Sequence, residues 1–173
     1  MKSNRGFSMI EALITLVLVS IGVLGMVALQ TRTLQNTQDS VQRNAAAALA
    51  NDLLESMRAQ PTGLPATSGF YKDEGDDFPD EPAAGCANTP VDASQQLACW
   101  AKKVKTALPG VTDELLSEDF YVCRTTNPGA CTPDAGSAVE IQIAWTVKAG
   151  ECMDGSDDES DSTVCRYRLR AEL

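Results

Sequence analysis

The stretch that decides the fold is "FSMIEALITLVLVSIGVLGMVAL", residues 7–29, which holds 22 uncharged residues and one carboxylate, Glu11. As a helix, a segment of this length crosses the roughly 30 Å hydrocarbon core of a bilayer. An isolated carboxylate in that core costs about 2.5–3.5 kcal/mol on insertion scales. An ordinary membrane span would not carry this cost, so Glu11 is a candidate functional residue.

Two ordinary interpretations of this segment leave Glu11 without a role. A cleaved secretory signal has a shorter apolar core and a small-residue cleavage site behind it, and "LQTRTLQNTQ" (29–38) offers no such site. A simple signal anchor fits the length of the segment. Lys2 and Arg5 in front of it would also hold the short leader in the cytoplasm. Neither interpretation explains the charge.

The residues around the charge resemble those of a known family. "RGFSMIEALITLVLVSIGVLG" (5–25) is similar to the class III signal of type IV pilins and pseudopilins: a basic leader ending in glycine, then phenylalanine, then a glutamate one helical turn later. Gly6, Phe7 and Glu11 occupy these three positions. The resemblance implies that prepilin peptidase cleaves between Gly6 and Phe7 on the cytoplasmic side. It also implies that the peptidase methylates the new amino group of Phe7.

Cleavage would create a charge partner for Glu11. The α-ammonium of Phe7 stays protonated near neutral pH. The resemblance implies that, in a filament, Glu11 pairs with the N-terminus of a neighbouring subunit. A matched pair is strongly attractive in a dry environment and costly when one partner is missing, and the helix dipole favours a carboxylate in the first turn. We therefore expect Glu11 to act in assembly.

Composition excludes several function classes. The chain has 173 residues, a net charge of −10 and no histidine. Its acidic balance argues against nucleic-acid binding, which needs a basic surface. The commonest general base and metal ligand is absent, and no nucleophile motif or glycine-rich phosphate loop is present. We expect no enzymatic activity, no catalytic residue and no cofactor.

The cysteines predict disulfides in an oxidising compartment. They are Cys86, Cys99, Cys123, Cys131, Cys152 and Cys165, all outside the apolar segment. We favour the nearest-neighbour pairs, Cys86–Cys99, Cys123–Cys131 and Cys152–Cys165, because each closes a short loop rich in Gly, Pro, Asp or Ser. A zinc site is the alternative. It lacks Cys-x-x-Cys spacing and histidine, so we expect no metal.

The helical pattern continues beyond the apolar segment. No proline interrupts it before Pro61, so we expect one helix from Phe7 to about Gln60, about 80 Å long at about 1.5 Å per residue. Gly22 and Gly25 could let this helix bend or could allow close packing, and both explanations remain open. The second half carries an apolar stripe at helical spacing. The stripe comprises Leu34, Val41, Ala45, Ala48, Leu49, Leu53 and Met57.

Two acidic runs, Asp73–Glu81 ("DEGDDFPDE") and Asp154–Asp161 ("DGSDDESD"), predict solvated loops. Calcium binding is the alternative for both, although EF-hand spacing is absent. Between them, residues 91–110 predict a short helix capped by Asp92 or Ser94. Its apolar face comprises Leu97, Trp100, Ala101, Val104 and Leu108, which places Trp100 in the core.

Three strands are expected at 120–126, 139–147 and 164–173, and the turn residues between them favour an antiparallel meander. In the central strand, Val139, Ile141, Ile143, Trp145 and Val147 face one way, while Glu140, Gln142 and Thr146 face the other. The apolar helix stripe is the obvious cover for one face. Arg166, Arg168 and Arg170 then line the solvent face, or alternatively bind a partner.

The expected fold class is α+β: a long N-terminal helix packed on a C-terminal antiparallel sheet, with an intervening αβ-loop that contains a short helix. This layout resembles the type IV pilin fold. "GVLGMVALQ", "ALPG" and "IAWTV" are further similar to minor pilins of the PilV (type IV pilus modification protein) family. The expected organisation is a cleaved leader (1–6), a membrane and filament-core half-helix (7–30) and a globular head (31–173).

The resemblance implies a minor pilin held in the bacterial inner membrane with its head in the periplasm, and then built into the pilus. Its partners would be prepilin peptidase, other minor pilins, the major pilin and a pilus-tip adhesin. It would prime pilus assembly and support adhesion and twitching motility. The alternatives are a minor pseudopilin of type II secretion and a membrane-tethered adhesin that does not polymerise.

Overall fold

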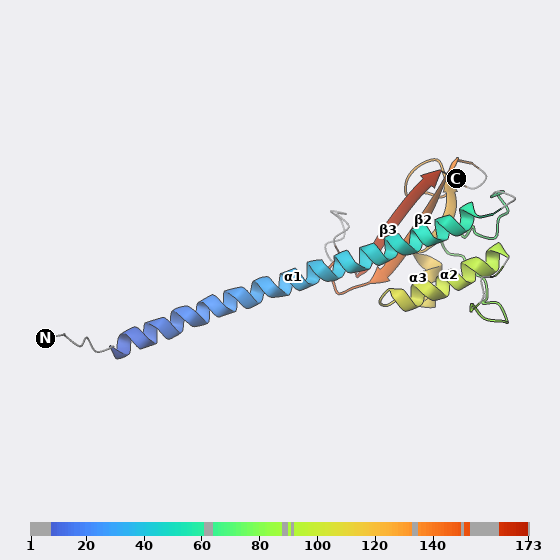
Figure 1. Cartoon of the computed structure of the whole chain (residues 1–173). Helices are drawn as coiled ribbons and strands as arrows, with labels where there is room; N and C mark the ends of the chain where they lie inside the picture. Colours follow the sequence, from blue (N-terminus) through green and yellow to red (C-terminus); the bar gives the residue numbers. More distant parts are fainter. Residues whose placement is uncertain are drawn as a thin grey trace. The chain divides into compact units, whose positions relative to one another are not determined.

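The computed structural model describes residues 8–60, 64–87, 90, 92–132, 135–149, 151–152 and 163–172. The chain divides into two compact units, the first ending at Gln38 and the second starting at Asp39. The elements are α1 (Met9–Arg58), α2 (Ala93–Ala107), α3 (Asp113–Glu118), β1 (Tyr121–Thr125), β2 (Ala138–Thr146) and β3 (Val164–Glu172) (Figure 1). The α+β fold class is confirmed.

Helix α1 has the predicted length within the described residues, but its buried face differs from the predicted stripe. Leu49, Leu53 and Met57 are buried as expected. Leu34 and Val41 are 64% and 62% exposed, and Ala48 is exposed too, so the stripe was wrong at these positions. The buried side chains of α1 are Asp39, Ala46, Leu49, Ala50, Leu53, Leu54 and Met57. A helical stripe shifted by one residue turns by about 100°, and only packing against the sheet selects between such neighbouring stripes.

Strands β1, β2 and β3 form the predicted antiparallel meander, with β2 in the centre. Val139, Ile141, Ile143 and Trp145 of β2 pack into the core that α1 and α2 also line. The apolar cover that the sheet needs therefore comes from α1, as predicted, and from α2 beside it (Figure 1).

Helix α2 is fixed by its cap and by its tryptophan. The Asp92 carboxylate accepts the Gln95 backbone N–H at 3.1 Å, which confirms one of the two predicted N-caps. Trp100 is buried, as expected, and its indole N–H donates to the Leu49 carbonyl at 2.8 Å. This bond ties α2 directly to α1.

Helix α3 was not predicted. Its N-cap Thr112 accepts the Leu115 N–H, and Asp113 and Glu114 occupy its first turn, where carboxylates favour the helix dipole. A capping threonine followed by two acidic residues is the local signal that could have identified it. Leu115 and Leu116 are buried and join the core.

Three disulfides staple the second unit. They join Cys86 to Cys99, Cys123 to Cys131 and Cys152 to Cys165. These are the nearest-neighbour pairs that the loop composition favoured. The first holds the loop before α2 onto that helix, and the second folds the residues after β1 back onto the strand.

Candidate functional site

The first candidate site is the start of α1. Gly6 and Phe7, the proposed processing residues, lie outside the described residues. Ser8 precedes the helix, and its carbonyl accepts the backbone N–H groups of Glu11 and Ala12 at 3.0 and 3.2 Å. Glu11 therefore lies in the first turn, and its side chain is exposed. Within the described part of the chain, the Glu11 carboxylate forms no ion pair.

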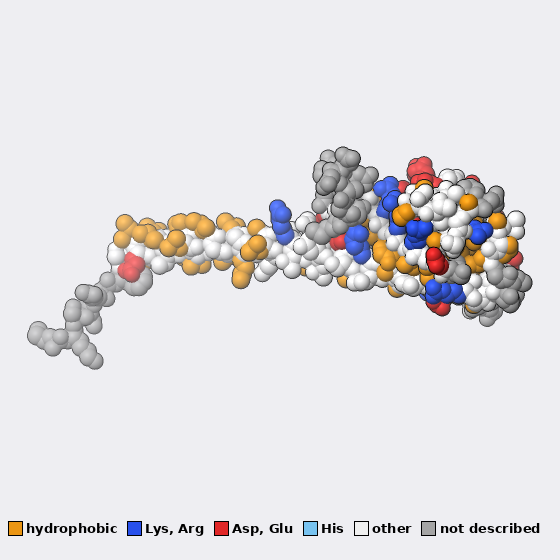
Figure 2. All heavy atoms as spheres, turned by 90° about the horizontal axis from the view of Figure 1, so that it is seen from above, with side chains coloured by type: hydrophobic (Ala, Val, Ile, Leu, Met, Phe, Trp, Pro, Cys, Tyr) orange, Lys and Arg blue, Asp and Glu red, His pale blue; other side chains and the backbone are white. Residues whose placement is uncertain are grey.

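Glu11 is surrounded by apolar side chains that the chain itself leaves uncovered. Large hydrophobic residues from Met9 to Leu29 are more than half exposed (Figure 2). By length and composition α1 could cross a membrane, and none of the residues in its most apolar 18-residue stretch is buried. Thr15 and Ser20 do not disrupt this surface, because their hydroxyls donate to the Ala12 and Leu16 carbonyls at 2.9 and 2.7 Å.

The two glycines of this half-helix meet no constraint within the chain. A Cβ added at Gly22 or Gly25 would have no neighbour within 4 Å, and α1 continues through both positions. Neither glycine is therefore needed for packing inside the described chain. Close approach of a second helix at these positions remains a proposal.

A polar network covers the second face of the sheet. Glu140 and Gln142 point away from the core as predicted, yet they are only 1% and 2% exposed. The Glu140 carboxylate accepts the Tyr121 hydroxyl at 2.5 Å and the Gly129 backbone N–H at 2.8 Å. Gly129 belongs to the segment that Cys131 fastens to β1. The disulfide thus keeps this segment over the carboxylate, which strand alternation alone could not reveal.

The arginine row of β3 belongs to the same network. Arg168 donates to the Gln142 side-chain oxygen at 2.6 Å, and Arg170 donates to the Thr126 carbonyl at 3.0 Å. The prediction of a solvent-exposed face is correct for Arg168 and Arg170. Arg166 is partly buried and forms an ion pair with Asp119 inside the head, at 2.6 Å.

Burial and the bond to Glu140 raise the pKa of the Tyr121 hydroxyl well above its ordinary value, and the Arg168 charge opposes this only in part. Tyr121 is buried and its hydroxyl faces a carboxylate, so ionisation would place two negative charges side by side. The hydroxyl consequently serves as a fixed hydrogen-bond donor in the head.

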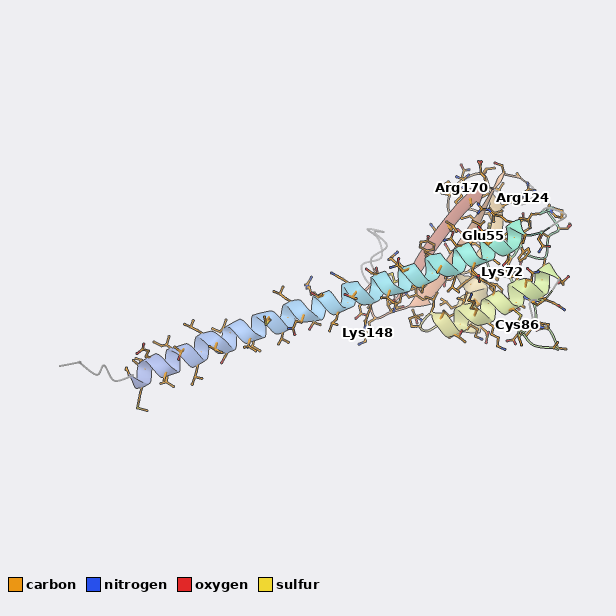
Figure 3. The ribbon with its side chains drawn as sticks, viewed as in Figure 1. Glu55, Lys72, Cys86, Arg124, Lys148 and Arg170 are labelled. Carbon is orange, nitrogen blue, oxygen red and sulfur yellow. A yellow bond between two sulfur atoms is a disulfide. The ribbon has the colours of Figure 1, made fainter. Side chains whose placement is uncertain are left out.

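Hydrogen bonds from Lys72 connect the loop before α2 to the end of α3. Its side chain is buried, and its ammonium donates to the carbonyls of Asp73, Ser117 and Phe120 at 3.0, 3.0 and 2.8 Å (Figure 3). Burial lowers the pKa of the ammonium, and the nearby acidic loop, Asp76 first, partly opposes this. Lys72 is a structural residue that sequence reasoning missed, because two of its hydrogen-bond acceptors are backbone carbonyls far away in the sequence.

A second polar anchor lies at the beginning of the second unit. Asp39 is buried and binds Arg43 one helical turn later at 2.7 Å. The Arg43 guanidinium carbon lies 5.7 Å from the centre of the buried Trp145 ring, within reach of a cation–π interaction. This group connects α1 to β2.

The Asp73–Glu81 run does not form a calcium cage in the described residues. There, the only metal-sized group of ligands is Asp73 with Cys123 and Cys131, and these two sulfurs are bonded to each other. In the Asp73–Glu81 run, Glu81 binds Lys102 at 2.5 Å. The run from Asp154 to Asp161 lies outside the described residues.

Comparison with known proteins identifies the N-terminal segment. Residues 1–27 match the prokaryotic N-terminal methylation motif, the class III signal peptide of type IV pilins and pseudopilins. No curated protein and no solved structure matches the chain. The motif implies processing by prepilin peptidase. Together with the apolar helix and the α+β fold, it supports a membrane-anchored type IV pilin or pseudopilin.

Proposed function

We propose that this chain is a minor pilin of the type IV pilus, of the PilV family. After removal of the leader, residues 1–6, residues 7–30 hold it in the bacterial inner membrane with the head, residues 31–173, in the periplasm. It then enters the filament and acts with other minor pilins and the major pilin to prime assembly. Its role in adhesion and twitching motility follows from that step, and it has no catalytic activity or cofactor.

The observation that carries this proposal is the position of Glu11. The carboxylate lies in an exposed apolar half-helix and has no charge partner among the described residues. Leaving a buried charge unpaired costs about 3–5 kcal/mol. The α-ammonium of a neighbouring subunit's Phe7 would remove that cost in the filament. Correct register would then be enforced mainly by the penalty for misplacing Glu11.

The decisive experiment follows a Glu11→Ala variant into the filament. Immunoblots of membranes and of sheared pili measure the same protein in both places. We expect normal membrane levels and loss from the pili. Glu55→Ala is the matched control, because Glu55 is an exposed carboxylate of the same helix that binds only Arg58 among the described residues, at 2.8 Å. Normal incorporation of Glu11→Ala would refute the assembly role and favour the adhesin that does not polymerise.

Mass spectrometry of the mature protein tests the processing step. We expect a chain that begins with a methylated Phe7. A chain that keeps Met1, or that is cut far from Phe7, would contradict the proposed processing.

A minor pseudopilin of type II secretion is the second candidate, because the N-terminal match supports both classes equally. A deletion strain separates them. Loss of surface pili with intact protein secretion supports the minor pilin, whereas intact pili with impaired secretion of extracellular proteins supports the pseudopilin.

A further inference from the structure

Arg124 has an unusual position in the sheet. It pairs with Val139, and Val122 pairs with Ile141, so all four side chains share the core-facing side of the sheet. The other side chains of the described strands on that face are Ile143, Trp145, Cys165, Tyr167, Leu169 and Ala171. Arg124 is therefore the single charged residue that these strands place on the face packed against α1.

The Arg124 guanidinium has no hydrogen-bond or ion-pair partner among the described residues. The side chain is only partly exposed, and the chain contains 24 acidic residues. Arginine commonly buries its aliphatic stem and keeps its charged head in water. The Arg124 guanidinium is therefore accessible and is available to an anionic ligand.

Arg124 lies near the C-terminal end of α1 (Figure 3). It lines a cavity of about 250 Å³ together with residues of that helix end. The polar part of its lining comprises Arg58, Gln60, Tyr71, Arg124 and Ser137. Apolar side chains, the buried Met57 among them, complete it. Elements far apart in the sequence thus bring two guanidinium groups, a phenol, an amide and a hydroxyl to one cavity.

The charge in this cavity has a single sign. Both charged residues among the described lining residues are arginines, and no carboxylate is among these residues. Arg58 binds Glu55 through one nitrogen, but the Glu55 side chain is 69% exposed and lies outside the lining. Burial raises the pKa of the Tyr71 hydroxyl, and Arg124 opposes that rise, so the guanidinium acts electrostatically on the same cavity.

The donor chemistry restricts what could bind. A guanidinium donates hydrogen bonds and accepts none, and its planar fork matches a carboxylate. Gln60 and Ser137 can both donate and accept, which suits hydroxyl groups. Tyr71 and Met57 offer apolar surface. Pockets for drug-sized ligands usually measure about 300–1,000 Å³, so this cavity fits a ligand of about one sugar ring.

We propose that this cavity is a binding site for an acidic sugar of the uronate class. Arg124 holds the carboxylate, Arg58 adds positive charge, Gln60 and Ser137 bind ring hydroxyls, and Tyr71 lies against the ring. The site lies in the head and does not depend on filament assembly. A result that excludes sugar binding would therefore leave the proposed minor-pilin function intact. A result that excludes the minor-pilin function would likewise leave the binding site intact.

Ligand-observed NMR titration of the full chain in detergent micelles tests this site with glucuronate. Glucose is the matched neutral ring and acetate the matched bare carboxylate. We expect glucuronate to bind at least about tenfold more tightly than either control, because a charge-assisted bidentate bond and the ring contacts both contribute. Equal binding of glucose or acetate, or no binding of millimolar glucuronate, would overturn the proposal.

Variants identify the residue that carries the affinity. Arg124→Gln should weaken glucuronate binding about tenfold or more, and Arg124→Lys should weaken it less, because the charge stays and the planar fork is lost. Arg170→Gln is the control, since Arg170 lies on the other face of the sheet and binds Thr126. Tryptophan fluorescence establishes that each variant is folded. Unchanged affinity in folded Arg124→Gln, or an equal loss in Arg170→Gln, would refute the assignment.

Discussion

The bond between Tyr121 and Glu140 gives a pH-dependent prediction for the stability of the head. Tyr121→Phe removes the hydroxyl that donates to the buried carboxylate at 2.5 Å and leaves it only the Gly129 N–H among the described donors. A hydrogen bond to a charged group contributes about 1.5–3 kcal/mol. We therefore expect the variant to be about 2 kcal/mol less stable at pH 7.

The sign of the pH dependence follows from the raised pKa of Tyr121. In the unfolded chain a tyrosine ionises near pH 10, while the folded hydroxyl stays protonated well above that value. The stabilisation is thus complete below pH 10 and is lost as the pH rises further. At pH 11 the wild type should lose about 1.4 kcal/mol through this residue. Tyr121→Phe has no hydroxyl to ionise and does not lose this contribution. The difference in unfolding free energy between the wild type and the variant should therefore shrink from about 2 kcal/mol at pH 7 to about 0.6 kcal/mol at pH 11.

Guanidinium denaturation of the full chain in detergent, followed by tryptophan fluorescence, measures both values. Trp100 and Trp145 are both buried in the second unit, so their emission reports unfolding of the head. Glu140→Gln is a useful companion, because it keeps an acceptor for Tyr121 and removes the charge. A stability difference between wild type and Tyr121→Phe that is the same at pH 7 and pH 11 would refute the reasoning.

Three further predictions concern the structure of the head. Lys72→Met should cost about 2–3 kcal/mol, because three carbonyls lose a charged donor while the desolvation cost of the ammonium disappears; chemical denaturation measures this. Gly136→Ala should cost more than about 2 kcal/mol in the same assay, because φ is +98° and the new Cβ would lie 2.3 Å from the Thr125 carbonyl oxygen. Replacing Cys86 and Cys99 together by serine should cost about 3 kcal/mol, since their bond closes a loop with a sequence separation of 13.

Matched controls make these three results interpretable. Gly75→Ala tests positive φ without a clash, because φ is +89° and nothing lies within 4 Å of an added Cβ. It should cost clearly less than Gly136→Ala, and an equal cost would contradict the steric argument. A Lys72→Met variant as stable as the wild type would show that the Lys72 hydrogen bonds contribute no stability. An unchanged denaturation midpoint for the double serine variant would show that the Cys86–Cys99 disulfide contributes none.

Local patterns in the sequence were sufficient for much of the molecule. The apolar run with its single carboxylate, the cap and apolar face of α2, and the order of the strands could all be inferred from neighbouring residues. These features depend on helical and strand periodicity and on turn chemistry, which act over a few residues. Glu11 stood out for the same reason, because its cost depends only on its immediate apolar surroundings.

The remaining features depend on contacts between distant segments. Leu34 and Val41 match a helical stripe as well as Ala46 and Leu54 do, and only the sheet and α2 select which residues of α1 are buried. Glu140 alternates as a solvent-facing residue should, yet the segment that the Cys123–Cys131 bond fastens to β1 covers it.

The cavity beside Arg124 shows most clearly the difference between what neighbouring residues determine and what contacts between distant segments determine. The sequence by itself placed Arg124 in a predicted strand, 120–126, but not on the core face of the sheet, and it did not show that Arg58 and Tyr71 line the same cavity. Those facts depend on the register of β1 against β2 and on where α1 ends. Register and packing are decided by the summed burial of many side chains. Only the tertiary structure therefore brings these groups together.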